Sequence, residues 1–394
     1  MTGLLARIDW VAWILLFARV IVIFAALLIS VMLVIWIERK VVADMQVRVG
    51  PNRAGPFGIL ITLADGIKLF FKEGITPTTA DRPVYLVAPL ASMVPAMLAF
   101  AVIPFGTGVF IFGRHVPFQI TDLSVGVLWI LAMASLAVYG VVLAGWSSGS
   151  NYPLLGAIRS GGQLISYEVG MGLALVSLLI YSGTLTMSGI VAIQARHFHV
   201  TGLGWLPKWN VFYQFPAFLL YMTAALAETN RPPFDLPEAE TELVAGYHTE
   251  YSGIKFAMFF LAEYMHMITI SAVGVTLFLG GWHGPMFHVV RWLWPLLWFG
   301  VKLYAVIFTL VWIRATLPRF RYDKLMSFGW KVLIPIGLLW VLVTASYVAL
   351  PLRYSPARSA LIIVAGTSSV LLLIGPLFSA PPRSVQARAE SEAR

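Results

Sequence analysis

The amino-acid sequence predicts an all-α integral membrane protein. Its mean hydropathy is +0.84, and 59% of its 394 residues are hydrophobic. Charged residues make up only 11% of the chain, against about a quarter in soluble domains. Several uncharged runs exceed the roughly 18 residues that indicate a membrane span. No alternating ten-residue pattern of a membrane barrel is present, so we expect helices to satisfy the backbone hydrogen bonds.

The hydrophobic runs predict about nine transmembrane helices. The first is too long for a signal-peptide core and is followed by charged IERK, so we expect it to be retained. The ninth is the shortest, because Pro356 and Pro376 bracket it. The predicted spans are residues 11–37, 84–105, 119–146, 162–182, 212–228, 254–280, 292–314, 328–350 and 359–379.

An amphipathic helix is predicted near residues 57–72, directly after the turn-forming segment VGPNRAGP. Apolar side chains recur at helical spacing there, against Asp65, Lys68 and Lys72. Such a helix lies in the membrane interface. It is either a simple surface helix or a flap beside an opening to the bilayer.

The distribution of lysine and arginine predicts the orientation. With the N-terminus outside, the long inner loops and the tail hold 18 of the 27 basic residues, and the outer side holds seven. We therefore expect the charged loops to be cytoplasmic and the protein to be a multi-pass component of a bacterial cell (inner) membrane. The net charge of +9 then reflects contact with anionic headgroups rather than nucleic acid.

The chain is expected to form one polytopic membrane domain, residues 1–379, followed by a disordered cytoplasmic tail, residues 380–394. It contains no cysteine, so it has no thiolate ligands for an iron–sulfur cluster and no disulfides. Its seven histidines show no metal-binding spacing. We expect no metal site here, and any electron carrier must belong to a partner.

A stretch running from Glu228 to Gly253 concentrates the acidic residues of the chain. Crowded carboxylates raise some of one another's pKa values, so protonation near neutral pH becomes possible. The stretch is either a proton relay or a plain solvated loop. Its carboxylates are Glu228, Asp235, Glu238, Glu240, Glu242 and Glu250.

Ionisable residues inside the predicted spans are further candidates, because an isolated charge there is costly. Glu168 lies in the fourth span and Glu263 in the sixth, with His266 three residues later. The alternative to a functional role is a structural ion pair, for instance of either glutamate with Lys302. Arg19 either has a role or extends its charge to the interface, and His266 is expected to be a packed, hydrogen-bonded histidine.

Five polar stretches together resemble one family, the membrane subunit that joins the two arms of proton-pumping NADH–quinone oxidoreductase (respiratory complex I), called the H subunit in bacteria. The resemblance covers about residues 10 to 350. The stretches are IERKVVADMQVRVGPNRAGPFG, LADGIKLFFKE, AGWSSGSNYPLLGAIRSGGQLISYEV, ETNRPPFDLPEAETELVAGYHTEYSGIKFAMFFLAEY and IRATLPRFRYDKLMSFGWK.

The resemblance implies a subunit of a proton-translocating enzyme without a redox centre of its own. Quinone is the implied substrate, and FMN and iron–sulfur clusters belong to partner subunits. Soluble quinone-site subunits and neighbouring membrane subunits are the implied partners. The family's quinone chamber corresponds to Arg39, Arg48, Arg53, Asp65, Lys68 and Phe71. Its proposed proton-relay and coupling carboxylates correspond to Glu168, Glu228, Asp235, Glu238, Glu240, Glu242 and Glu263. No catalytic residue is assigned.

Three other interpretations compete. The homologous membrane subunit of another ion-pumping dehydrogenase, or of a membrane-bound hydrogenase, shares part of the acidic pattern. A standalone transporter also has buried charges, but no paired broken helices in two matching halves are evident. A passive membrane anchor would tolerate neutralisation of Glu168, Glu238 or Glu263.

Overall fold

The structure, a computed structural model, confirms the all-α membrane fold. It describes residues 10–111, 113–195, 207–235, 244–285, 290, 292–349 and 368. Within these residues, seven helical segments are long and apolar enough to cross a membrane. They are α2 (Trp10–Met45), α4 (Arg82–Phe100), α5 (Gly126–Ser147), α6 (Asn151–Ser182), α11 (Gly253–Phe278), α12 (Leu293–Thr316) and the segment Tyr322–Ala349.

Shorter elements connect these helices. The last span comprises α13 (Tyr322–Phe328), a π-helical turn η3 (Gly329–Leu333) and α14 (Ile334–Ala349). Strands β1 (Val109–Ile111) and β2 (Arg114–Val116) form an antiparallel hairpin in which Phe110 faces His115. The remaining elements are η1 (Pro56–Gly58), α3 (Ile61–Phe71), α7 (Met187–Gln194), α8 (Asn210–Tyr213), α9 (Phe215–Glu228) and η2 (Gly246–His248).

The predicted fifth span, residues 212–228, is shorter than a full crossing. The helix breaks at Gln214, which has non-helical backbone angles, and α9 begins directly after it with Phe215 and Pro216. The 14 residues of α9 rise about 21 Å, less than the roughly 30 Å hydrocarbon core. As a result, the carboxyl end of α9, with Glu228, lies inside the bundle. The predicted ninth span, residues 359–379, lies outside the described residues apart from Ser368, and the predicted tail lies wholly outside them.

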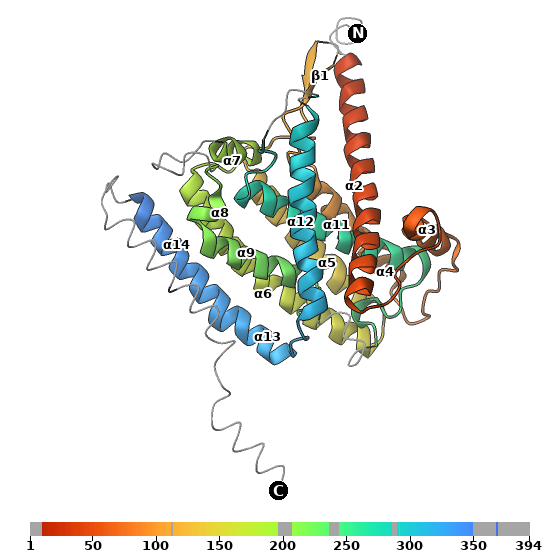
Figure 1. The fold of residues 1–394 in the computed structure, drawn as a ribbon. Coiled ribbons are helices and arrows are strands. Elements are labelled where there is room, and N and C mark those ends of the chain that lie inside the picture. The colour runs from red at the N-terminus through yellow and green to blue at the C-terminus, as the bar shows by residue number, and fades with distance from the viewer. Residues whose placement is uncertain are drawn as a thin grey trace, which may run out of the picture.

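Helix α11 is the centre of the bundle, with the largest buried share among the seven spans. Helices α4, α5, α6 and α9 pack in succession around it, and α14 covers α6. Helices α2 and α12 stand side by side against α11, and α3 lies beside the lower part of α2 (Figure 1). This arrangement surrounds the polar residues of α9 and α11 with apolar helices.

Helix α6 begins at Asn151, eleven residues before the predicted start of the fourth span. Its extra turns contain glycines that permit close packing. A Cβ atom at Gly156 would lie 2.8 Å from the backbone of Gly246. On the facing helix α5, a Cβ atom at Gly145 would lie 2.2 Å from the Cβ of Ala157. Tertiary packing therefore outweighs the low helix propensity of glycine here.

The predicted amphipathic helix is present as α3, and it lies against α2. The indole nitrogen of Trp36 donates a hydrogen bond to the carbonyl of Phe57 at 3.0 Å, and Thr62 donates one to the carbonyl of Met32 at 3.3 Å. No residue of α3 is buried. Its apolar side chains, Ile67 among them, remain exposed, as expected for a helix that faces lipid.

Candidate functional site

An open cleft lies where the end of α2 meets the end of α12. Its volume is about 610 Å³, and its walls come from the end of α2, the segment after it, Pro232 and Arg314. Four ionisable side chains face it: Glu38, Arg39, Arg48 and Arg314. The cleft is therefore polar, with more cations than anions along its wall.

The structure brings together some of the predicted chamber residues. Arg39 and Arg48 line the cleft. Asp65 does not, but it accepts hydrogen bonds from Arg39 at 2.8 Å and from Lys68 at 3.0 Å. Partial burial of Asp65 raises its pKa, but Arg39 and Lys68 together lower the pKa by more than burial raises it. The net pKa is therefore below the ordinary value, and the carboxylate stays ionised. Asp65 and Lys68 thus hold one wall residue in place.

The other two predicted chamber residues lie away from the cleft. Arg53 is exposed on the loop between α2 and α3. Phe71, at the end of α3, is 86% exposed. Within the described part of the chain, neither residue borders the cavity.

Glu38 is the hub of a buried charge cluster beneath the cleft, and the sequence analysis did not identify it. Its carboxylate pairs with Arg231 at 3.4 Å and with Arg314, and it accepts a hydrogen bond from the Tyr264 hydroxyl at 2.9 Å. The side chains of Glu38 and Arg231 are only 7% and 6% exposed. The signal available in the sequence was the position of Glu38 at the inner end of the first span.

Arg231 connects this hub to Glu263 on α11. Its Nε atom lies 3.0 Å from the Glu263 carboxylate, and its guanidinium carbon lies 4.4 Å from the ring centre of Tyr264. Glu38, Glu263, Arg231 and Arg314 therefore form a neutral set of two carboxylates and two guanidiniums. Pairing of this kind offsets the cost of burying the charges.

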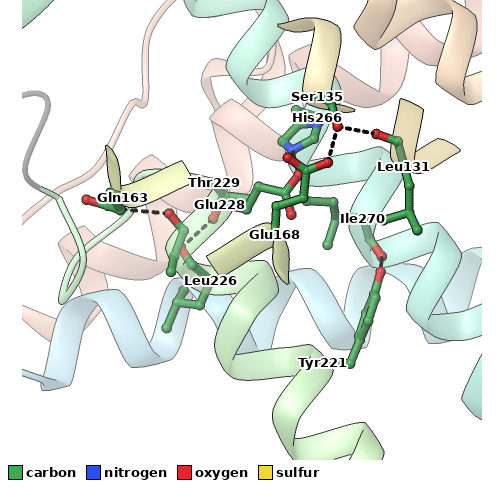
Figure 2. A network of polar contacts seen from close by, with 11 residues as sticks. Leu131, Ser135, Gln163, Glu168, Tyr221, Leu226, Glu228, Thr229, His266 and Ile270 are labelled. Carbon is green, nitrogen blue, oxygen red and sulfur yellow. Dashed lines mark hydrogen bonds and ion pairs between the residues drawn. The ribbon is translucent and has the colours of Figure 1, made fainter. Parts of the chain in front are cut away.

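A second cluster lies deeper, between α5, α6, α9 and α11. Glu228 ends α9, and its carboxylate lies 3.1 Å from Nε2 of His266. Glu168 on α6 is close enough to both groups to interact with each electrostatically. Figure 2 shows the side chains of Glu168, Glu228 and His266 converging. Two predicted relay carboxylates thus meet inside the bundle.

Ser135 on α5 can stabilise either protonation state of Glu168. Its hydroxyl oxygen is within hydrogen-bond distance of the Glu168 carboxylate and 3.1 Å from the carbonyl of Leu131 (Figure 2). A hydroxyl donates one hydrogen bond and accepts others. It can donate to an ionised Glu168, or donate to Leu131 and accept from a protonated Glu168. The site therefore permits Glu168 to change its charge without losing its partner.

A cavity joins the two clusters. It has a volume of about 60 Å³, and its wall includes Glu263 from the first cluster and both Glu228 and His266 from the second. Thr229 and Asn230 border it as well. Most of the wall is apolar, but the polar groups on it offer hydrogen bonds to the few water molecules that a cavity of this size can hold. Ionisable groups therefore extend from the open cleft to Glu228 and His266, which interact electrostatically with Glu168.

The rest of the acidic stretch is only partly described. Asp235 accepts a hydrogen bond from Arg319 at 2.7 Å. Gln163 on α6 donates to the carbonyls of Ala227 at 2.8 Å and Phe234 at 2.7 Å, which holds the chain after α9 against α6. Three predicted relay residues, Glu238, Glu240 and Glu242, lie outside the described residues.

A structural ion pair was considered from the sequence for Glu168 and Glu263. Glu263 does pair with Arg231, but the suggested partner Lys302 is wrong. Its ammonium donates to the carbonyls of Leu279, Gly281 and His283 at 2.6–3.0 Å. These carbonyls follow the end of α11, where helix carbonyls lack intrahelical partners. Arg19 likewise donates to a carbonyl, that of Ile120, at 2.8 Å.

The fold and the site together define a polytopic membrane protein with a polar cleft at the ends of two long helices and buried carboxylates among its apolar helices. The comparisons with known proteins agree with that class. A family model described as NADH dehydrogenase matches residues 18–345, and the chain belongs to this family.

Two curated relatives are similar over most of the chain. The H subunit of NADH-quinone oxidoreductase from Frankia casuarinae is 56% identical over 333 residues, which cover 84% of this chain and 72% of the relative. The corresponding H subunit from Frankia alni is 56% identical over 339 residues, which cover 85% of this chain and 73% of the relative.

Proposed function

We propose that this chain is the H subunit of a proton-translocating NADH–quinone oxidoreductase and that the cleft beside α2 forms part of its quinone chamber. The names of the two Frankia relatives support the assignment to this enzyme. The open cleft supports the chamber, because Arg39, Arg48 and Arg314 offer donors to an oxygen-bearing ring. Of the predicted chamber residues, Asp65 and Lys68 hold the wall residue Arg39 in place. Arg53 and Phe71 do not line the cleft in the described part of the chain.

The observation that carries the coupling role is the continuity of ionisable groups from the cleft to Glu168. Reduction of a quinone in a chamber of low dielectric changes the local charge, and charge interactions there exceed their strength in water. In the proposal, Glu38 and Arg231 pass this change to Glu263, and the cavity passes it to Glu228 and Glu168. Asp235, Glu238, Glu240 and Glu242 belong to the loop that connects these groups. Such coupling is reciprocal, so proton occupancy in turn biases the chamber.

In this proposal the chain needs partner subunits. Electrons must reach the quinone, and the chain has no cysteine that could ligate an iron–sulfur cluster. FMN and iron–sulfur clusters are assigned to soluble subunits that dock on the charged loops, and other membrane subunits receive the coupled protons. The excess of basic residues in the inner loops supports a cytoplasmic docking face. The proposed location is the bacterial cell membrane.

The test is purification of the complex from native membranes through a tag on this chain, followed by assay of Glu228→Gln and Glu263→Gln. We expect flavin and iron–sulfur absorbance, NADH-driven quinone reduction, and a loss of at least about tenfold in coupled proton translocation in each variant. Glu73→Gln is the matched control, because Glu73 is exposed on the connection between α3 and α4. Oxidation of hydrogen or of another cofactor, but not of NADH, would move the chain to a related ion-pumping complex. Full pumping by both variants would refute the carboxylate relay.

A further inference from the structure

His266 occupies a junction that the carboxylates alone do not explain. Its ring lies 3.1 Å from the Glu228 carboxylate, one helical turn beyond Glu263 on α11. It is mostly buried, with a side chain 16% exposed. In this position a basic group stands between the carboxylates of three helices.

Two cavities meet at this histidine. The larger one, about 60 Å³, includes Glu263, Thr229 and Asn230 and lies on the side of the charge cluster beneath the cleft. The smaller one, about 20 Å³, lies among the apolar residues of α4, α5, α6 and α11 and includes Thr269. Both cavities are lined by Glu228 and His266. The Glu228–His266 pair therefore borders both spaces and is the ionisable pair that they share among the described residues.

The groups around His266 make an imidazole suitable for that transfer. The titratable residues facing the two cavities or in electrostatic contact with the pair are Glu168 on α6, Tyr221 and Glu228 on α9, Tyr247 in η2, and Glu263 on α11. Glu263 is paired with Arg231, and the hydroxyl of Tyr221 donates to the carbonyl of Ile270 at 2.7 Å. Histidine can accept a proton on one nitrogen and release one from the other, and its ordinary pKa lies near neutral pH.

We propose that His266 is the proton carrier between Glu228 and Glu168. A proton on the Glu228 carboxyl moves to Nε2 of the neutral imidazole, which leaves a carboxylate beside an imidazolium. The imidazolium then releases one proton toward the Glu168 carboxylate, and Ser135 adjusts its hydrogen bond to the new charge. One proton is taken up, one is released, and no electron moves. The inference rests on the proposed function, since it adds a carrier to the same relay.

The decisive variant is His266→Gln in the assembled complex. A glutamine side chain still offers an N–H group to Glu228, so a merely structural hydrogen bond survives, but it cannot carry a proton. We expect proton transfer to slow by about 100-fold, at the lower limit of contributions from general acid–base groups. The pH profile of coupled activity is expected to differ from that of the wild type. His115→Gln is the control, since His115 is exposed on the hairpin.

The measurements are NADH-driven quinone reduction and the quenching of a pH-sensitive dye in sealed vesicles, each from about pH 5.5 to 8. A His266→Gln enzyme with the wild-type rate and profile, alongside an impaired Glu228→Gln enzyme, would overturn the carrier role and leave the relay intact. Normal pumping in both variants would instead refute the relay itself.

If His266→Gln does not assemble, His266→Asn provides the second test. Infrared difference spectra of the wild-type complex with isotope-labelled histidine, recorded on quinone reduction, provide a third that requires no variant. Absence of any imidazole–imidazolium change in those spectra would also overturn the proposal.

Discussion

Replacement of Glu38 by glutamine tests the charge cluster beneath the cleft most directly. The wild-type set contains two carboxylates and two guanidiniums, so Glu38→Gln leaves a net charge of +1 in a buried site. Removing one partner of a buried ion pair costs about 3–5 kcal/mol. The side chain of Arg314 is 31% exposed and regains some hydration, and the new amide still accepts one hydrogen bond. We therefore expect the lower limit, about 3 kcal/mol, which corresponds to roughly a 100-fold change in the folding equilibrium.

The charge balance of this cluster also predicts a specific rescue. A second substitution, Arg314→Gln, removes the excess positive charge and should recover about 1–3 kcal/mol as a coupling energy. Arg319→Gln is the matched control, because Arg319 is similarly exposed at 35% but pairs with Asp235 instead. Arg319→Gln should recover none of the stability that Glu38→Gln loses.

The assay is the thermal aggregation midpoint of this chain within the solubilised complex, measured for the wild type, the single variants and both double variants. The reasoning is refuted if Glu38→Gln leaves the midpoint unchanged. It is equally refuted if Arg319→Gln restores the midpoint as well as Arg314→Gln does, because the effect would then depend on the overall charge and not on the pair.

Three further predictions concern single residues. Ser135→Ala should slow proton translocation about tenfold, because leaving a buried group without its hydrogen bond costs about 1–3 kcal/mol. Dye quenching in vesicles measures the translocation rate, and Thr309→Ala is the control because Thr309 is exposed. Burial lowers the pKa of His248 to about 4, so the folded state binds fewer protons than the unfolded state. The free energy of unfolding should therefore keep its full value above about pH 6.5 and fall by up to about 3 kcal/mol as the pH drops to about 4. His248→Phe should abolish this pH dependence in thermal melts. Gly253 has φ +59°, and a Cβ there would lie 3.0 Å from the carbonyl of Lys72, so Gly253→Val should lower the melting midpoint by an amount equivalent to about 1–3 kcal/mol, whereas a valine at open Gly172 should not.

The sequence predicted the long helices well because membrane burial imposes one strong and local rule. Seven of the nine predicted spans correspond to long apolar helices in the described residues. The errors arose where packing overrides local preference. The early turns of α6 pack Gly156 against Gly246, and at the break Gln214 accepts a hydrogen bond from Trp340 at 2.6 Å. Neither contact can be inferred from the sequence alone, because the residues it joins are far apart in the chain.

The site was predictable to the extent that a charge stands out against an apolar background. Glu168 and Glu263 were identified because they interrupt hydrophobic runs, and the structure places them in two connected clusters. Glu38, Arg231 and Arg314 lie at span ends or in a loop, where charges are ordinary, so only the three-dimensional fold reveals their convergence. The suggested partner Lys302 was wrong because it stabilises backbone carbonyls at the far end of α11.

The arrangement of these charges argues for a functional role more strongly than for a stabilising one. A buried set of two carboxylates and two guanidiniums is at best as stable as well-packed apolar residues of the same volume. The cavity beside it, lined by Glu228, Glu263 and His266, lacks the packing that a filled apolar core would provide. The deeper pair, Glu228 and His266, consists of groups that can both exchange protons, and Ser135 serves Glu168 in either charge state. A bundle built only for stability requires none of these features, whereas a bundle that must answer a charge change in the cleft requires groups that are paired, hydrated and able to change protonation.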